Sequence, residues 1–514
     1  MAGTTGVEGD TANGGPSDAD ASDRMQGVVP VPVESKSTGN EYAITADTTI
    51  HVDSEAATGV ADYLAGLLRP ATGYELPVVD APSRGPDGGV SLLLRGAPSK
   101  VGDEGYRLNV TTRGVTIRAN EAAGLFAGVQ TLRQLLPPSV ESDTKQAGPW
   151  TVPGGHVLDY PRFSYRGAHL DVARHFFPVE DVKQYIDYLA QYKLNHLHLH
   201  LTDDQGWRIE IESWPKLTEI GGSTEVGGRP GGYYTRSEYE ELVEYAQDRF
   251  ITVIPEIDMP GHTNAALASY AELNCDGERE DPYTGIEVGF SSLCVDKPVT
   301  YEFIDDVIRE VAEMTPGPHI HIGGDEAHQT TEEDYDQFMD QAVAIVEKYD
   351  KRPVGWHQIL AADPPESTVS QYWYPGREAP DVAEAAQNGI ELVASPASRA
   401  YLDMKYTEDT ELGLDWAGLT TVEDAYRWDP GGFLEGVDES SVKGPETALW
   451  SETVETLEDI EFMLFPRMPA VAELGWSPES RTAWEPFRQR LATQGPRWDV
   501  QDVNYYESPQ VPWS

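Results

Sequence analysis

The feature of this sequence that most restricts its fold is a series of short apolar segments, each followed by a longer stretch with helical periodicity. Eight such segments lie between Tyr160 and about residue 500: RGAHLDVA (166–173), HLHLHL (196–201), ITVIPEID (251–258), HIHIGGDE (319–326), RPVGWHQ (352–358), TVSQYWY (368–374), IELVASP (390–396) and TALWSE (447–452). The intervening stretches 178–193 and 235–250 have the N-cap and apolar periodicity of helices. Eight strand–helix repeats predict a (β/α)8 barrel over residues 160–500, and no repeated sequence unit favours a solenoid instead.

The residues before the barrel have a different pattern. Residues 28–150 combine alternating strand patterns, such as YRLNVTTRGVTIRAN (106–120), with helical patterns at 56–69 and 121–136. This combination predicts a small α+β domain. Residues 1–27 are rich in Gly, Ser, Thr and Asp without periodicity, which is typical of a disordered acidic tail. The expected fold class is therefore α/β, a TIM barrel preceded by a small α+β domain.

The negative charge of the chain restricts its partners. Lys and Arg total 37 against 87 Asp and Glu, a net charge of −50 that is spread along the whole chain. Nucleic acid and anionic membrane surfaces would be repelled, so we expect a neutral substrate. The sequence has no run of 18 apolar residues, so no membrane-spanning segment is predicted.

Such a charge also destabilises a compact chain at low ionic strength, which favours a halophilic protein adapted to concentrated salt. The alternative is an ordinary acidic secreted protein. The only cysteines, Cys275 and Cys294, lie in one Gly- and Asp-rich region. A disulfide between them would contribute about 3 kcal/mol and favour secretion, and two free thiols are the alternative. The N-terminus lacks the basic and apolar regions of a signal peptide, which favours the cytoplasm, so the indications of localisation disagree.

Polar and aromatic residues follow each of the eight segments, at the barrel end where functional groups lie. They are Arg174, Asp203 with Asp204, Asp258, Asp325 with Glu326, Trp356, Trp373, Tyr401 with Asp403, and Trp450 with Glu452. Large aromatic rings with carboxylates and one arginine suit a sugar, whose ring faces are apolar and whose rim carries hydroxyls. The pattern predicts a carbohydrate site at the mouth of the barrel.

The adjacent carboxylates Asp325 and Glu326 follow two glycines in HIGGDEAH (321–328). Cleavage of a glycosidic bond needs a carboxylic acid that protonates the leaving oxygen. Glu326 is the candidate, and we expect Asp325 and partial burial to raise its pKa. The usual second carboxylate lies across the sugar ring and cannot be the chain neighbour of the acid. The pair therefore favours a substrate that supplies its own nucleophile.

Six sequence motifs occur in order through the barrel. They are LDVARHFF (170–177), LHLHLTDDQGWR (197–208), PEIDMPGHTNAA (255–266), HIGGDEAH (321–328), YLDMKY (401–406) and ALWSE (448–452). Together they resemble glycoside hydrolase family 20, the β-N-acetylhexosaminidases, and the domain before the barrel resembles the N-terminal domain of that family. The resemblance implies an exo-acting, retaining glycosidase that removes terminal N-acetylhexosamine from neutral β-glycosides such as chitin oligosaccharides, without a cofactor. It also implies that the acetamido oxygen of the substrate attacks the anomeric carbon and forms an oxazolinium intermediate.

The same resemblance implies a role for individual residues. Glu326 matches the general acid/base, Asp325 the acid that orients the acetamido group, and Tyr401 the hydroxyl that bonds the acetamido oxygen. The remaining matches are Trp356, Trp373 and Trp450 for the aromatic walls, Arg174, Asp403 and Glu452 for the ring hydroxyls, Trp416 for the aglycone side, Asp203, Asp258 and His262 for the polar support behind the acids, and Cys275 with Cys294 for a bridged pair. Gluco or galacto preference, chain length and oligomeric state stay open.

Two functions of other classes are considered. HLHLH places His196, His198 and His200 on one strand face, a spacing seen in metal sites, so a metal-dependent amidohydrolase barrel is one alternative. We expect these histidines to pack in the barrel interior instead, and no metal site is predicted. The other alternative is a non-catalytic carbohydrate-binding protein, which would lack Glu326 or Asp325, and both are present.

Overall fold

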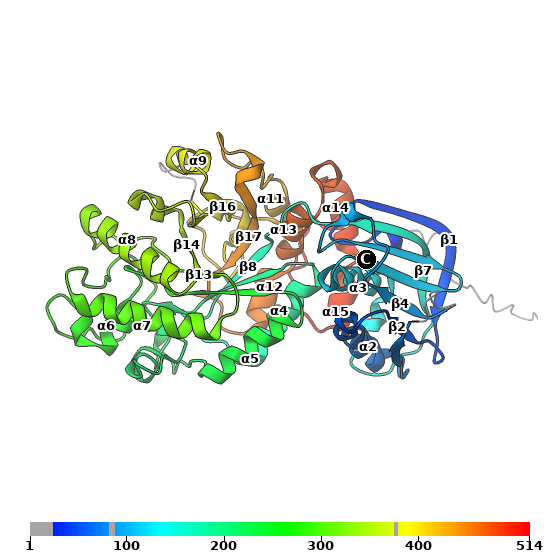
Figure 1. Cartoon of the computed structure of the whole chain (residues 1–514), viewed down its shortest axis with the longest axis horizontal. Coiled ribbons are helices and arrows are strands. Elements are labelled where there is room, and N and C mark those ends of the chain that lie inside the picture. The colour runs from blue at the N-terminus through cyan, green and yellow to red at the C-terminus, as the bar shows by residue number, and fades with distance from the viewer. Residues whose placement is uncertain (1–23, 82–87, 375–378, 514) are drawn as a thin grey trace, which may run out of the picture.

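The computed structural model describes residues 24–81, 88–374 and 379–513, which form two domains that lie side by side (Figure 1). The expected disordered tail, residues 1–27, lies outside the described residues except for its last four. Of these four, Arg24 and Met25 pack against the N-terminal domain. Met25 is fully buried, and Arg24 Nη1 donates to the carbonyl oxygens of Leu135 at 3.0 Å and Thr151 at 2.8 Å. The expected boundary at residue 27 is therefore too late, because Met25 already belongs to the core.

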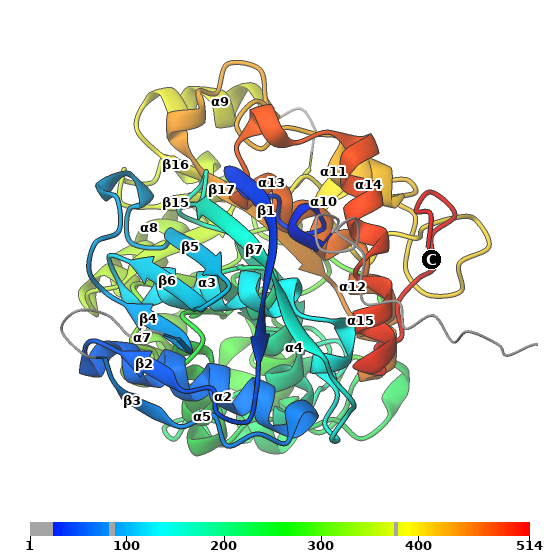
Figure 2. The same ribbon diagram turned by 90° about the vertical axis from the view of Figure 1, so that its right-hand side faces the viewer.

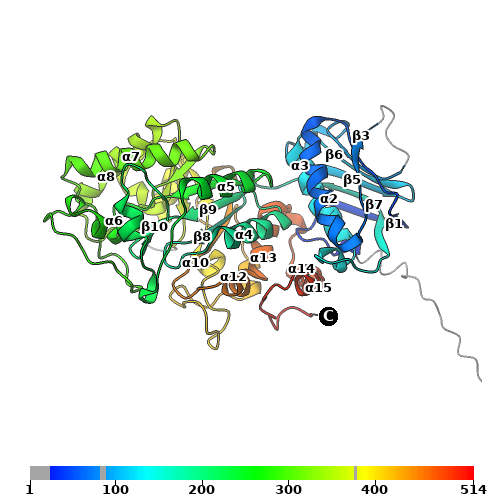
Figure 3. The ribbon, with the colours of Figure 1, turned by 90° about the horizontal axis from the view of Figure 1, so that it is seen from below.

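The N-terminal domain is one mixed sheet of seven strands with two helices against it. The strand order is β1-β7-β5-β6-β4-β2-β3. The strands are β1 (Glu34–Ile44), β2 (Ile50–Val52), β3 (Val78–Asp80), β4 (Val90–Leu93), β5 (Tyr106–Thr111), β6 (Gly114–Ala119) and β7 (Trp150–Asp159). Helices α2 (Thr58–Thr72) and α3 (Ala122–Leu135) cover the sheet face nearer to the barrel (Figure 3), and Figure 2 views the domain from the side away from the barrel. Because β7 pairs with both β1 and β5, the domain extends to Asp159, beyond the expected end at residue 150.

The second domain is a closed barrel of eight parallel strands, in the order β12-β13-β14-β15-β16-β17-β8-β9. The strands are β8 (Gly167–Asp171), β9 (His196–His200), β12 (Thr252–Glu256), β13 (His319–His321), β14 (Arg352–Trp356), β15 (Val369–Tyr372), β16 (Glu391–Ala394) and β17 (Val442–Leu449). Each of the eight apolar segments contributes one of them, so the prediction of a TIM barrel is confirmed. Strands that are covered on both faces read as nearly continuous apolar runs, which is why the segments were recognisable.

Helices surround the barrel or, near the end of the chain, lie between it and the N-terminal domain. They are α4 (Val179–Gln191), α5 (Arg236–Gln247), α6 (Asn264–Ser269), α7 (Pro298–Met314), α8 (Glu332–Lys348), α9 (Ala379–Gln387), α10 (Ala397–Ala400), α11 (Val422–Tyr426), α12 (Leu457–Leu464), α13 (Arg467–Trp476), α14 (Trp484–Ala492) and α15 (Gly495–Val500). The predicted helices at 178–193 and 235–250 are α4 and α5, and α5 begins with a reciprocal capping box between Thr235 and Glu238. Within the described ranges, no helix has the length and apolar character needed to cross a bilayer.

A buried ion pair joins the two domains. Lys193 Nζ, between α4 and β9, lies 2.9 Å from Asp159 Oδ2 at the end of the N-terminal sheet. The same carboxylate accepts hydrogen bonds from the Tyr106 hydroxyl and from Trp476 Nε1, each at 2.9 Å. Helices α14 and α15 lie at this junction (Figure 1). The domains therefore share a polar core as well as an apolar one.

Candidate active site

A cavity of about 770 Å³ opens at the carboxyl ends of the barrel strands. Ten of the predicted site residues line it: Arg174, His262, Asp325, Glu326, Trp373, Tyr401, Asp403, Trp416, Trp450 and Glu452. Ile286, Val288, His328, Gln358 and Tyr374 also line it. Cavities of this size hold small molecules of a few sugar units, and here all the functional groups come from strand ends and the loops that follow them.

The backbone after β13 turns so that two neighbouring acids reach one cavity. Gly323 and Gly324 take φ values of +64° and +96°, and Glu326 has a φ of +45°. A Cβ on Gly323 would lie 1.6 Å from Asp258 Oδ1, so only glycine fits there. Neighbouring residues of an extended strand point to opposite faces, and this turn removes that restriction.

His262 lies between the two acids. Its Nε2 is 3.5 Å from Asp325 Oδ2 and 3.5 Å from Glu326 Oε2. Burial raises the pKa of Asp325 to about 6, although the charge of His262 opposes the shift. Burial also acts to raise the pKa of Glu326, but His262, Arg174 and His328 outweigh it and lower that pKa. The expectation that the pKa of Glu326 is raised is therefore wrong, because a cationic imidazole lies beside the carboxylate.

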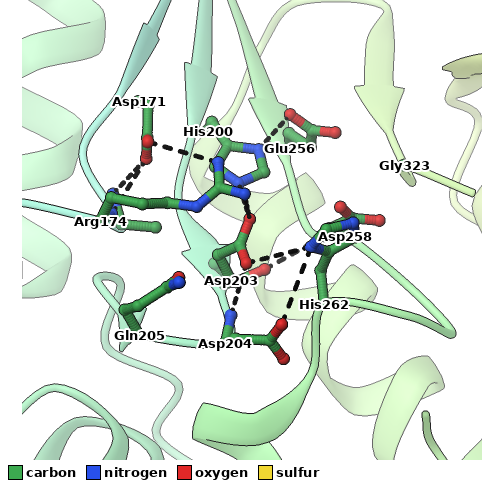
Figure 4. Close-up of polar contacts among 12 residues, drawn as sticks. Asp171, Arg174, His200, Asp203, Asp204, Gln205, Glu256, Asp258, His262 and Gly323 are labelled. Carbon is green, nitrogen blue, oxygen red and sulfur yellow. Dashed lines mark hydrogen bonds and ion pairs between the residues drawn. The ribbon is translucent and has the colours of Figure 1, made fainter. Parts of the chain in front are cut away.

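Asp203 connects His262 with Arg174 (Figure 4). Arg174 Nη2 lies 2.8 Å from Asp203 Oδ2, and His262 Nδ1 lies 3.2 Å from Asp203 Oδ1. His200 Nε2 lies 2.8 Å from Asp203 Oδ2. Asp203 and Asp258 are buried behind the cavity and do not line it, which agrees with a supporting position.

Aromatic rings form the walls of the cavity. Trp373 and Tyr401 are nearly parallel, with centroids 6.2 Å apart and an angle of 12° between the planes, and Trp450 lies 6.2 Å from Tyr401. Trp416, which is 47% exposed, meets Trp373 edge-on at the mouth. Trp373 Nε1 donates to Gln358 Oε1 at 2.9 Å, which fixes the ring. The walls form an apolar box that widens into an aromatic rim.

Trp356 does not line the cavity, contrary to the prediction that it forms a wall. Its side chain is 1% exposed, and its ring centroid lies 5.7 Å from that of Trp450. Its Nε1 donates to Glu256 Oε1 at 2.8 Å. The side chain points from the end of β14 into the barrel interior, so it supports the ring of Trp450 from below.

Some buried acceptors at the cavity are left without a partner. Within the described chain, Asp325 Oδ1 and Asp403 Oδ1 form no hydrogen bond. Burial, and next the charge of Glu452, raises the pKa of Asp403 well above its ordinary value. A buried acceptor without a partner is costly, so these oxygens suit a ligand that brings hydroxyl or amide donors.

The histidines of β9 have protein partners. His196 stacks on Tyr165 with centroids 4.1 Å apart. Both ring nitrogens of His198 face carboxylates, those of Glu256 at 3.0 Å and Glu446 at 2.9 Å. One side-chain nitrogen or oxygen each from His200, Asp203 and Asp258 lies within 4.8 Å of the others, a spacing that metal ligands also have. Both ring nitrogens of His200, however, are hydrogen-bonded to carboxylates, those of Glu256 and Asp203. The three histidines of this strand therefore have stacking or hydrogen-bond partners within the described chain.

Several site residues were not identified from the sequence. Ile286 and Val288 stand on a loop without periodicity and offer no signal. Gln358 lies two residues after Trp356, so its position at a strand end was the available signal. Glu256 is a carboxylate inside an apolar strand segment, which is itself unusual and points to a buried polar role.

An eight-stranded barrel with a carboxylate pair, polar side chains and an aromatic box at its mouth defines an enzyme that binds a sugar. Comparisons with known proteins identify it further. Residues 163–479 match the catalytic domain of glycosyl hydrolase family 20, and residues 25–160 match domain 2 of that family. The chain belongs to glycosyl hydrolase family 20. This membership excludes the metal-dependent amidohydrolase alternative.

Individual relatives cover nearly the whole chain. The chain is 44% identical to the Beta-N-acetylhexosaminidase of Cellulomonas fimi, over 95% of this chain and 97% of the relative. The GH20 beta-N-acetylhexosaminidase structure from Streptomyces coelicolor A3(2) is 56% identical, with a TM-score of 0.93 over 95% of this chain and 99% of that one. A mutant Streptomyces plicatus beta-hexosaminidase in complex with product (GlcNAc) is 57% identical, with a TM-score of 0.92 over 95% and 98% of the two chains. These relatives do not support the halophilic hypothesis, which stays a prediction.

Proposed function

We propose that this β-N-acetylhexosaminidase removes terminal N-acetylglucosamine from the non-reducing ends of β-linked glycosides, with Glu326 as proton donor and the acetamido group of the substrate as nucleophile. The observation that carries the proposal is the turn at 323–326, which directs Asp325 and Glu326 into one aromatic-walled cavity. A carboxylate that neighbours the acid in the chain cannot attack from the opposite side of the sugar ring. It can hold a group that does.

The proposed reaction begins with proton transfer. Glu326 protonates the leaving oxygen while the acetamido oxygen attacks the anomeric carbon, and Glu326 then takes a proton from the water that opens the oxazolinium ion. Asp325, as an anion, accepts the acetamido N–H and stabilises the positive charge that develops there. The Tyr401 hydroxyl donates to the acetamido oxygen and aims it. A nucleophile held within its own substrate gains the entropy advantage of an intramolecular reaction.

Other residues hold the sugar. We assign the ring hydroxyls to Arg174, Asp403 and Glu452, the acetamido methyl to the box of Trp373 and Trp450, and the aglycone side to Trp416. Asp203, Asp258 and His262 support the acid pair from behind. Support for N-acetylglucosamine comes from the Streptomyces plicatus complex with this product and from the Vibrio harveyi exo beta-N-acetylglucosaminidase, which is 30% identical to this chain. Neutral chitin oligosaccharides fit the strongly acidic chain as substrates.

Glu326→Gln tests the acid assignment. The variant should lose roughly 10²–10⁴-fold in kcat/KM on N,N′-diacetylchitobiose (chitobiose below), whose leaving group needs a proton, and far less on a nitrophenyl N-acetyl-β-glucosaminide, whose leaving group does not. The measurement is steady-state kinetics on both substrates. Glu333→Gln, which changes an exposed acid of α8 outside the cavity, serves as the control. Equal turnover of chitobiose by wild type and Glu326→Gln would refute the assignment.

A further inference from the structure

Glu256 is a carboxylate enclosed in the barrel core, and the chemistry proposed above does not use it. It is fully buried at the end of β12. Its Oε1 lies 2.8 Å from Trp356 Nε1 and 3.0 Å from His321 Nδ1. Its Oε2 contacts His200 Nδ1 and lies 3.0 Å from His198 Nε2. Glu256 accepts hydrogen bonds from Trp356 and His200, and the imidazoles of His198 and His321 lie 3.0 Å away. Burial acts to raise the pKa of Glu256, but the charges of these histidines outweigh it and keep that pKa well below its ordinary value, so the carboxylate is ionised.

One of these donors leads toward the active site. His200 contacts Glu256 through Nδ1 and Asp203 through Nε2, at 2.8 Å. With a carboxylate at each nitrogen, His200 is held as a cation with both nitrogens donating. Asp203 in turn faces His262 Nδ1 at 3.2 Å, and His262 Nε2 faces Glu326 at 3.5 Å. Figure 4 shows Glu256, His200, Asp203 and His262 as successive members of a curved row of contacts, which turns at Asp203.

We propose that Glu256 is a positioning residue for the acid pair, acting through His200, Asp203 and His262. The inference rests on the proposed function of Glu326 and Asp325, and it adds a remote carboxylate to that site. Glu256 keeps His200 doubly protonated. His200 then keeps its hydrogen bond to Asp203, and Asp203 keeps His262 turned toward the two acids.

Several other charged groups face this row, and their contributions must be separated from that of Glu256. Around Glu256 these are His169 on β8, His198 on β9 and His321 on β13. Around Asp203 they are Arg174 and the neighbouring Asp204, and around His262 they are Asp204, Asp258, Asp325 and Glu326. The negative charge of Glu256 also acts on Asp325 directly, since it is among the causes that raise the pKa of Asp325. Loss of that charge should lower the pKa of Asp325.

The barrel offers a matched control in Glu446, a second fully buried carboxylate on β17. It accepts from Gln371 Nε2 at 2.6 Å and from the Tyr165 hydroxyl, and it lies 2.9 Å from His198 Nδ1. None of its contacts in the described chain is with His200, Asp203 or His262. Glu446→Gln therefore removes the same charge from the same core without breaking the row.

The test compares Glu256→Gln, Glu446→Gln and His200→Gln, with thermal unfolding of each variant to confirm that it folds. In Glu256→Gln, kcat on chitobiose should fall roughly 10-fold or more, as for other residues that orient a reacting group. KM should change little. The fall of kcat/KM at acidic pH, measured on a nitrophenyl N-acetyl-β-glucosaminide and called the acidic limb below, should move to lower pH, because the pKa of Asp325 is lowered. Glu446→Gln should keep kcat within about 3-fold and leave the limb in place. The double variant Glu256→Gln/His200→Gln should lose no more than His200→Gln alone, because both substitutions break one path.

The inference is overturned if Glu256→Gln keeps wild-type kcat and an unshifted acidic limb, or if Glu446→Gln produces the same changes. If Glu256→Gln does not fold, the inference is tested with His200→Gln. A folded His200→Gln variant with wild-type kcat on chitobiose overturns the inference. An inactive wild-type protein would instead refute the proposed function, so the two failures are distinguishable.

Discussion

At the residue scale, two side chains of the site stand on strained backbone. Glu326 and His262 have φ values of +45° and +54°, in the left-handed region that side chains other than glycine rarely adopt. Such a conformation costs about 1–3 kcal/mol per residue and persists where the surrounding structure over-determines it. Here the two strained residues place the Glu326 carboxylate 3.5 Å from the His262 imidazole, so the strain contributes to the arrangement of the active site.

The pKa of Asp325 predicts the pH dependence of the reaction. Burial raises this pKa to about 6, and the proposed role requires the ionised form. On a nitrophenyl N-acetyl-β-glucosaminide, whose leaving group needs no proton from Glu326, we therefore expect kcat/KM to rise with pH through about 6 and to fall below it, because protonated Asp325 cannot stabilise the positive acetamido nitrogen. Asp325→Asn should lower kcat/KM strongly and remove this acidic limb. The measurement is the pH profile of kcat/KM for the wild type and for Asp325→Asn. An unchanged acidic limb in Asp325→Asn would mean that another group causes the limb.

At the element scale, the loop between α6 and α7 carries part of the cavity mouth. Cys275 and Cys294 are joined by a disulfide that encloses most of this loop, including Ile286 and Val288. The pairing that the resemblance implied is thus present. The loop has no helix or strand of its own beyond one short turn near its start, so the covalent link restricts its ends.

Removal of this disulfide should destabilise the protein. The double variant Cys275→Ser/Cys294→Ser should lose about 3 kcal/mol in free energy of unfolding, from the loop-closure entropy of the unfolded chain. Denaturant unfolding of the variant and of the oxidised wild type gives the difference. Wild type treated with a reductant should reproduce the loss, and identical unfolding midpoints would show that the link contributes nothing.

Individual elements also show how far sequence reasoning reaches. ITVIPEID was recognisable as a strand because buried parallel strands are largely apolar, and HLHLHL because its leucines recur with the period of two of a strand. Strand β7 was not predicted, because nine of its ten residues, 151–159, lie between the expected end of the small domain and the expected start of the barrel. Its strand state depends on pairing with β1 and β5, which are distant in sequence.

At the scale of the whole molecule, the buried ion pair between Lys193 and Asp159 couples the domains. Lys193→Met leaves the Asp159 charge in the interface without its cation, so the free energy of unfolding should fall by roughly 3–5 kcal/mol. Denaturant unfolding checks this value. Lys183→Met, which breaks the pairs of Lys183 with the exposed Glu180 on α4 and the exposed Glu241 on α5, is the control and should change little. A loss in Lys193→Met no larger than in the control would contradict the role of the pair.

The net charge of −50 predicts a dependence on salt. Screening shortens the range of repulsion among the acidic groups, so the thermal midpoint should rise as NaCl increases from dilute buffer to molar concentration. Thermal unfolding across the series measures the effect, with a neutral solute at equal osmolality as the control. A midpoint that is flat or falls with salt would contradict the halophilic interpretation.

The sequence by itself determined the barrel, the domain before it and most of the residues at the cavity. These follow from local rules, since apolar runs specify buried strands and the carboxyl ends of parallel strands meet at one mouth. Only the tertiary structure decided the position of Trp356 beneath Trp450, the direction of the Glu326 pKa shift and the enclosure of Glu256 by histidines. Each of these depends on distances between side chains that are far apart in the chain, and electrostatic interactions in a buried site change steeply with such distances.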